Sequence, residues 1–173
     1  VRPDGKEVWV SNHISDSVSI IDTVASSPTY LHVVATIQEF DKRARSTRFD
    51  EPVGIAFASN KKAYVALSSE NEIGVIDVVK REVEKRLKIT AQDPRAIVVR
   101  GDRLYVIPFE SNNQTQLSGG AKDKIDGKLV TFDAYDHSID NNNVLSLGHV
   151  TDIVKHPDVP DRDLYVFDTK TDE

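Results

Sequence analysis

Four ionisable side chains in the middle and second half of the chain have the types that bind anions or transfer protons. Arg95 directly follows a proline, Glu110 lies in a polar segment, and Asp152 is three residues after His149. A guanidinium, two carboxylates and an imidazole around one opening can hold an anionic ligand or act as general acid and base. The same groups can equally form ion pairs between neighbouring structural elements, and the spacing leaves both interpretations open.

The polar segment from Pro108 to Gly127 carries the densest set of hydrogen-bonding groups, with Phe109 and Leu117 as its expected apolar anchors. We predict a loop that contacts a ligand or a protein partner; the alternative is a surface loop that packs on itself. The candidate contact residues in this segment and elsewhere in the chain are Asn12, His13, Arg95, Glu110, Asn112, Asn113, Gln114, His149 and Asp152.

Histidine spacing and the lack of cysteine limit the metal and redox chemistry of this stretch. None of the five histidines shows the tight two-His spacing of a zinc site, so no metal ligand set is predicted. Zero cysteines exclude disulfides, cysteine nucleophiles and covalent haem c attachment within these residues. No phosphate-binding glycine loop, Gly-x-Ser-x-Gly elbow or zinc-protease motif occurs. We expect no cofactor within this chain, and the pattern favours a non-catalytic role for the segment alone.

Charge and hydropathy narrow the range of partners. The net charge of −6 argues against nucleic-acid binding, which requires a basic face. No apolar run approaches the roughly eighteen residues of a membrane span. The chain starts at Val1 without Met and without a charged segment followed by an apolar one. We interpret the sequence as the interior of a larger polypeptide.

A repeated pattern of short strands would position the candidate residues. In each copy an aromatic strand is followed by a strand that ends in Asp, and an apolar strand precedes the aromatic one. The strands alternate and are rich in β-branched residues, as a pleated, half-buried surface requires. The aromatic strands contain Trp9, Tyr64, Tyr105 and Tyr165; the Asp-ended strands are 17–22, 72–77 and 128–133; the preceding strands are 52–57, 94–99 and 151–154.

Two features of the repeat could be mistaken for something else. Asp22, Asp77 and Asp133 could suggest a carboxylate cluster, but their recurrence predicts that each caps the turn that follows it. The charged stretch from Val79 to Lys88 has partly helical spacing. Its place in the repeat predicts an outer edge strand instead, protected from sheet pairing by its charges.

The period of the repeat is that of a propeller blade. Pro52 and Pro94 are 42 residues apart, and Tyr64 and Tyr105 are 41 apart. Four short strands in about 40–45 residues form one blade. We predict an all-β fold, a β-propeller of four-stranded antiparallel blades, with about three to four blades, incomplete, in this chain. The expected parts of this one domain, 1–173, are a partial blade at 1–40, a blade at 52–90, a blade at 94–147 with the insertion 108–127, and a partial blade at 150–173.

Several of these segments resemble the YVTN-repeat β-propeller family. The matching runs are Trp9-Val10-Ser11-Asn12, Val18-Ser19-Ile20-Ile21-Asp22-Thr23 and Pro52-Val53-Gly54-Ile55-Ala56. Members of this family occur in surface-layer proteins, and similar propellers accompany periplasmic haem and quinone redox enzymes. The resemblance therefore implies a periplasmic or extracellular location.

Blade geometry would bring two sets of loops to one face: those joining strands two and three, and those leading from strand four into the next blade. We expect function on that face, in the loops 11–17, 41–51, 68–72, 91–95, 108–127 and 148–152. The leading hypothesis is an extracytoplasmic binding and scaffold module that docks a protein partner such as a cytochrome-bearing domain, with haem c held by the partner or an adjoining domain. The alternatives are the propeller part of a periplasmic redox enzyme or hydrolase with its site at the channel mouth, and a surface-layer or adhesion protein. The remaining blades are expected from the same polypeptide or another subunit.

Overall fold

The computed structural model describes residues 1–110, 115–118, 124–125, 128–129, 131–133, 152–155 and 162–173, with the backbone alone at 110 and from 115 to 155. The chain divides into two compact units. The first unit contains residues 1–111 and 163–173, and the second contains residues 112–162. The second unit is therefore inserted in sequence within the first.

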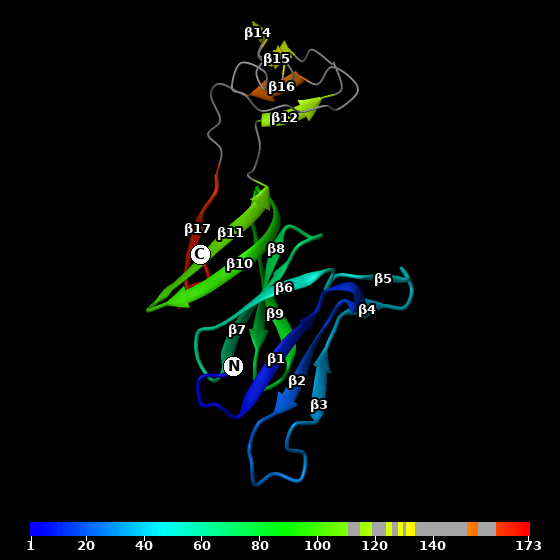
Figure 1. The fold of residues 1–173 in the computed structure, drawn as a ribbon, viewed down its shortest axis with the longest axis vertical. Coiled ribbons are helices and arrows are strands. Elements are labelled where there is room, and N and C mark those ends of the chain that lie inside the picture. The colour runs from blue at the N-terminus through cyan, green and yellow to red at the C-terminus, as the bar shows by residue number, and fades with distance from the viewer. Residues whose placement is uncertain (111–114, 119–123, 126–127, 130, 134–151, 156–161) are drawn as a thin grey trace. The chain divides into compact units, whose positions relative to one another are not determined.

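The first unit contains three antiparallel sheets of three or four strands, which we number as blades one to three (Figure 1). Blade one has the order β1 (Glu7–Asn12), β2 (Ser17–Asp22), β3 (Val33–Ile37), and these strands take the places of the second, third and fourth strands of a blade. Blade two has the order β6 (Pro52–Phe57), β7 (Lys62–Leu67), β8 (Glu72–Asp77), β9 (Glu82–Lys88). Blade three has the order β10 (Gln92–Arg100), β11 (Arg103–Glu110), β17 (Tyr165–Asp168). A short hairpin of β4 (Phe40–Asp41) and β5 (Ser46–Thr47) lies between blades one and two in the sequence.

The core lies between the blades, because the two middle strands of blade two, β7 and β8, bury both of their faces. Ala63, Val65 and Leu67 belong to one apolar cluster with blade one, and Tyr64 and Ala66 belong to a second cluster with blade three. Alternate side chains of one strand point to opposite faces of a sheet, so β7 is apolar at five successive positions. The remaining members from blades one and three are Trp9, Val18, Ile20, Ile37, Leu104 and Val106.

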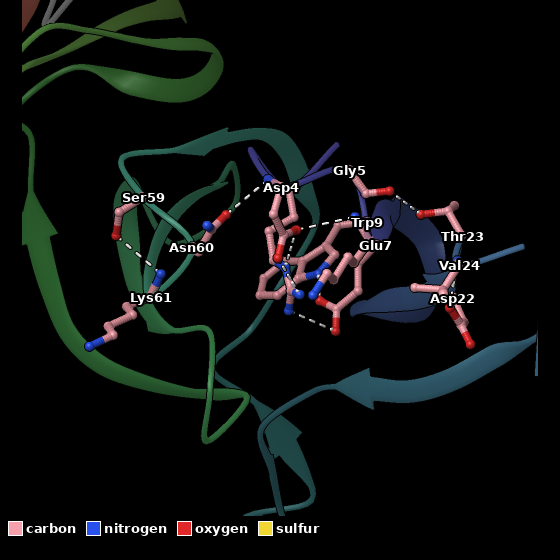
Figure 2. A network of polar contacts seen from close by, with 12 residues as sticks. Asp4, Gly5, Glu7, Trp9, Asp22, Thr23, Val24, Ser59, Asn60 and Lys61 are labelled. Atoms are coloured by element: carbon pink, nitrogen blue, oxygen red, sulfur yellow. Dashed lines mark hydrogen bonds and ion pairs between the residues drawn. The ribbon is translucent and has the colours of Figure 1, made fainter. Parts of the chain in front are cut away.

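The predicted turn caps are present at Asp22 and Asp77. The carboxylate of Asp22 accepts a hydrogen bond from the backbone N–H of Val24 at 2.8 Å (Figure 2). The carboxylate of Asp77 accepts from the N–H groups of the second and third residues after it, at 2.8 and 2.9 Å. Asp168 does the same at 2.8 and 3.4 Å. These caps fix the turn after the third strand of each blade.

The strand predicted to open a fourth blade is instead the third strand of blade three. β17 pairs antiparallel with β11, with Tyr105 opposite Val166, so Tyr165 does not occupy the place of Trp9, Tyr64 and Tyr105. The prediction of a fourth partial blade at 150–173 was wrong on this point. Asp168, rather than Asp133, is the counterpart of Asp77.

The insertion in blade three is correspondingly longer than the predicted 108–127, because β11 extends to Glu110 and its partner β17 begins at Tyr165. Within the second unit β16 pairs with both β12 and β15, and β13 pairs with β14. The described residues of the predicted third strand, 128–133, and of the predicted inner strand, 151–154, therefore pair within the second unit. The bounds are β12 (Thr115–Ser118), β13 (Lys124–Ile125), β14 (Lys128–Leu129), β15 (Thr131–Asp133) and β16 (Asp152–Lys155).

The predicted fold class is confirmed: the described chain is an all-β, incomplete β-propeller of antiparallel blades. Blade two has all four strands, and β9 is its outer edge strand, as predicted for the charged stretch. The one helix among the described residues is the short 3-10 turn η1 (His13–Ser15). No helix in that part of the chain is long and apolar enough to cross a lipid bilayer.

Candidate functional site at the loop face

Two equivalent hydrogen bonds link the blades on the predicted loop face. Asp16, just before the third strand of blade one, accepts at 3.1 Å from the backbone N–H of Glu51, just before the inner strand of blade two. Asn71 accepts at 2.8 Å from the N–H of Asp93, the second residue of β10 in blade three. All four residues have positive φ, between 48° and 55°. Such a conformation is uncommon outside glycine, above all for Glu51, so the links hold locally strained backbone in place.

A polar pocket of about 290 Å³ lies between these links. It is formed by the loop between β7 and β8, by Glu51 directly before β6, and by the first two residues of β10. The predicted loops 41–51, 68–72 and 91–95 therefore meet at one place. The lining residues are Glu51, Ser68, Ser69, Asn71, Gln92 and Asp93.

Glu51 is fixed in the pocket by the loop of blade two. Its carboxylate accepts hydrogen bonds from the hydroxyls of Ser69 at 2.7 Å and Ser68 at 3.1 Å. These bonds, led by that of Ser69, lower the pKa of Glu51, and the nearby His13 imidazole adds to the shift. Glu51 is therefore a preorganised anion at neutral pH.

Arg95 joins the carboxylate of Asp93 to an exposed aromatic ring. Its Nη2 lies 2.6 Å from Asp93 Oδ2, and the hydrogen bond with Asp93 raises the pKa of Arg95. The Arg95 guanidinium carbon lies 4.3 Å from the centroid of the exposed Phe109 ring. A guanidinium on an aromatic face within about 6 Å forms a cation–π contact. This end of the face thus offers a flat cationic and apolar surface beside the anionic pocket.

The carboxyl of Asp50, next to Glu51 in the sequence, has a pKa shifted in the opposite direction. Burial raises its pKa, and the negative charge of Asp16 adds to the effect. Asp50 therefore takes up a proton more readily than an isolated aspartate. Among the described residues, no group of three or more His, Cys, Asp or Glu side chains is arranged to hold a metal ion.

The structure places some of the sequence-predicted residues on this face. Arg95 pairs with Asp93 beside the pocket, and His13 is exposed in η1. Asn12 donates from Nδ2 to Ser17 Oγ at 3.1 Å and to Ser19 Oγ at 2.8 Å, so its amide is engaged within blade one.

The other predicted residues cannot be assigned to this face. Asn112, Asn113, Gln114 and His149 lie outside the described residues, as does the side chain of Glu110, while Asp152 begins β16 in the second unit. The grouping of Arg95, Glu110, His149 and Asp152 around one opening stays a prediction.

Sequence reasoning missed the residues that line the pocket itself. Glu51, Ser68, Ser69, Asn71, Gln92 and Asp93 were covered only as parts of loops or their ends. A usable signal was present: an acidic residue directly precedes the proline of each inner strand, in Glu51-Pro52 and Asp93-Pro94.

Neither a protein-family model nor a curated protein sequence matches the chain. Among solved structures, the chain is similar to hydrazine synthase of Kuenenia stuttgartiensis, with a TM-score of 0.50 and 20% identity over 62% of this chain and 27% of that chain. Two further structures, the WD40 repeats of RRP9 and a luciferin-regenerating enzyme, have TM-scores of 0.49 and 0.46 at 16% and 17% identity. They are matched over 66% and 94% of this chain and over 30% and 45% of theirs.

The chain thus spans less than half the length of each of these proteins. At 20% identity the likeness to hydrazine synthase speaks for the fold and for no reaction. The blade order within the first unit and this likeness together define the class of protein: the chain is part of a β-propeller, a fold that supports binding and scaffold modules.

Proposed function

We propose that this chain is the binding and scaffold part of a β-propeller that docks a protein partner on its loop face. The observation that carries the proposal is the pocket in which three loops from consecutive blades meet. Strained but hydrogen-bonded backbone fixes Glu51 and Asp93 there at the ends of rigid strands. Binding residues in repeat scaffolds are typically displayed on loops of this kind.

The loop face offers the chemistry of a polar protein contact. Glu51 is a fixed anion, and Arg95 with Phe109 adds a guanidinium stacked on an exposed ring. Arg and aromatic residues are enriched among the groups that dominate the binding energy of interfaces. The insertion between β11 and β17 begins directly after Phe109 and Glu110, and we infer that it extends the contact surface.

The test is association of the full-length protein with its native partner, captured by chemical cross-linking and quantified by mass spectrometry. We expect Glu51→Gln with Asp93→Asn to reduce the cross-linked partner by roughly fivefold or more, because buried polar contacts lose their charge. Lys61→Gln is the matched control, since this exposed residue lies in a turn at the other ends of the strands. Equal loss with the control, or no loss with the double variant, would contradict docking at this face.

A second variant tests the role of the insertion. β11 and β17 pair side by side, so a short turn between Glu110 and Asp163 can replace residues 111–162. We expect the blades to keep their cooperative unfolding and the partner to be lost. Retained association after this deletion would limit docking to the pocket itself.

The YVTN-type repeats support the finer part of the proposal, an extracytoplasmic location with a cytochrome-bearing partner. The measurement is the visible absorbance spectrum and iron content of the purified native complex. A haem spectrum in proportion to the partner is expected. A complex without haem would overturn the cytochrome partner and leave the scaffold role standing.

A further inference from the structure

A polar contact joins blade one to blade two at the end of their strands opposite the loop face. Arg81, in the turn after the third strand of blade two, places Nη2 3.3 Å from Oε1 of Glu7. The indole Nε1–H of Trp9 donates to Oε2 of the same carboxylate at 3.0 Å (Figure 2). We call this contact between a turn and the second strand of the preceding blade the turn bridge.

The same turn bridge joins blade two to blade three with the charges exchanged. Asp172, in the turn after β17, places Oδ2 2.7 Å from Nζ of Lys62. The hydroxyl of Tyr64 donates to Asp172 Oδ1 at 2.6 Å. In both bridges the carboxylate therefore binds an aromatic donor and a cation from across the interface; Glu7 also has Arg2 of its own blade at 3.1 Å.

The two bridges are built from equivalent positions. Arg81 and Asp172 have φ of 62° and 58°, and their N–H groups donate to the carbonyls of Asp77 and Asp168 at 2.7 and 2.8 Å. On the other side of the bridge, the charged residue lies two positions before the aromatic one in each second strand. Because side chains two apart in a strand share a face, the pair always points toward the next blade.

Blade three carries the same pair with nothing to receive it among the described residues. Arg103 lies two positions before Tyr105 in β11, as Lys62 does before Tyr64. Arg103 reaches only Asp168 of its own blade, at 3.5 Å, and no hydrogen bond to the Tyr105 hydroxyl occurs within the described part of the chain.

The described residues leave the apolar row around Tyr105 uncovered as well. Val98, Tyr105 and Val166 lie opposite one another on the three strands, and the two valines are 56% and 47% exposed. The equivalent row of blade two, Ala56–Tyr64–Val75, is at most 8% exposed because blade three covers it. The face of blade three thus repeats, in register, a surface that this chain twice uses to bind a blade.

We propose that a further blade of the same build covers this face, and that its left-handed turn residue is Asp or Glu, which binds Arg103 and Tyr105. A guanidinium and a phenol hydroxyl can both donate to one carboxylate, whereas a cation would be repelled by Arg103. The inference rests on the scaffold part of the proposed function and is independent of docking at the loop face.

A second copy of this chain does not satisfy the same requirement. In blade one the left-handed turn residue is Leu31, with φ of 62° and its N–H bonded to the Asp22 carbonyl at 2.8 Å. A leucine side chain accepts no hydrogen bond, so Leu31 of a copy would give neither Arg103 nor the Tyr105 hydroxyl an acceptor across the interface. Blade one of a second copy is therefore excluded, and the occupant that we propose is a blade from outside residues 1–173; a cross-link to residues 111–162 would contradict it.

Photo-cross-linking in the full-length native protein identifies the occupant. With Tyr105 replaced by benzoylphenylalanine, we expect a cross-link to a peptide outside residues 1–173 in which an Asp is followed four residues later by Asp or Glu. A cross-link to residues 1–37 of a second copy, or to a peptide without that acidic residue, overturns the proposal. The positive control is benzoylphenylalanine at Tyr165, whose hydroxyl lies 2.8 Å from Thr90 Oγ1, so it must label the Thr90 region. Labelling by the control alone also overturns the proposal.

Charge reversal then tests the acidic residue that the cross-link locates. We expect Arg103→Glu to lower the melting midpoint of the full-length protein by about 2–4 °C, and reversal of the acidic residue to Lys to restore at least half of that loss. Lys61→Glu, at an exposed turn, should leave the midpoint within about 1 °C. No loss with Arg103→Glu, or no rescue, contradicts the bridge. Arg103→Glu is expected to leave association through the loop face unchanged, whereas Glu51→Gln with Asp93→Asn weakens that association without weakening the bridge.

Discussion

The turn bridge occurs at both interfaces, between blades one and two and between blades two and three. It lies at equivalent positions in the two, but the charges of its strand and turn residues are exchanged. In the first, the strand supplies the carboxylate of Glu7 and the turn supplies Arg81; in the second, the strand supplies Lys62 and the turn supplies Asp172. Backbone geometry and apolar packing therefore fix where the contact lies, and each pair of blades sets its own charges. Such pairing specifies which blade follows which more than it adds stability.

The strongest test of this comparison removes the aromatic residue from a covered and from an uncovered blade. Tyr64 is fully buried between blades two and three, so Tyr64→Ala should lower the free energy of unfolding by about 3–5 kcal/mol through the cavity it leaves. Tyr105→Ala, the matched change in blade three, should cost less than about 1 kcal/mol in residues 1–173 alone. Urea unfolding followed by circular dichroism measures both. Equal losses of stability in the two variants would contradict the view that Tyr64 is covered by a neighbouring blade and Tyr105 is not.

A second test compares two glycines in the strands of blade two. A Cβ on Gly54, in the inner strand, would lie 2.3 Å from the carbonyl oxygen of Arg95, whereas on Gly74 its nearest neighbour would be 3.6 Å away. Backbone atoms cannot yield, so Gly54→Ala should destabilise by about 1–3 kcal/mol. Gly74→Ala should stay within about 0.5 kcal/mol of the parent. The same urea titration decides, and a tolerated Gly54→Ala would show that the inner strands can move apart.

The sequence predicted where strands occur better than it predicted the place of each strand within its blade. Trp9, Tyr64 and Tyr105 occupy matching strands as expected, because alternation and period are local properties. Tyr165 was misplaced because the aromatic–valine pattern fits a second or a third strand equally well. Hydrogen bonding to β11, across an insertion of about fifty residues, decides its place. The pair Asp168-Thr169, which repeats Asp22-Thr23, was the available signal.

The loop face was predictable only as a set of segments. Blade geometry places the loops 41–51, 68–72 and 91–95 together, and they do meet at the pocket. The individual residues follow from backbone conformation: the positive φ of Glu51 and Asp93, and the bonds from Asp16 and Asn71 that hold them. Asp and Asn adopt this conformation more readily than other non-glycine residues, but their presence in a loop does not fix it, and Glu51 carries no such signal.

Double-mutant cycles on the two turn bridges should give unequal coupling. We expect about 1–2 kcal/mol between Lys62 and Asp172, where the Asp172 side chain is 11% exposed and the contact is 2.7 Å. About 0.5 kcal/mol is expected between Glu7 and Arg81, because Arg81 is 34% exposed. Arg2 also lies 3.1 Å from Glu7 and keeps that carboxylate paired when Arg81 is removed. The cycles use Lys62→Met with Asp172→Asn, and Glu7→Gln with Arg81→Met, in urea unfolding. A larger coupling at Glu7 would reverse the ranking.

The smallest effects concern two carboxyls, at opposite ends of the strands, whose pKa values shift in opposite directions. Backbone N–H groups, chiefly that of Lys80, lower the pKa of Asp77, so its contribution to stability is present above about pH 3.8 and is lost as the pH falls through the lowered value. Burial raises the pKa of Asp50, so its contribution is present below about pH 3.8 and is lost as the pH rises through the raised value.

Asparagine substitutions should therefore act on opposite limbs of the pH profile. Asp77→Asn should lower the urea midpoint at neutral pH and converge with the parent in acid. Asp50→Asn should raise the midpoint at neutral pH, because a carboxylate that is poorly solvated and close to Asp16 is removed, and the two profiles should again converge in acid. Midpoints measured from pH 3 to pH 7 separate the two cases. If both variants shifted the urea midpoint at neutral pH in the same direction, Asp50 would not be a destabilised carboxylate, and the prediction would be wrong.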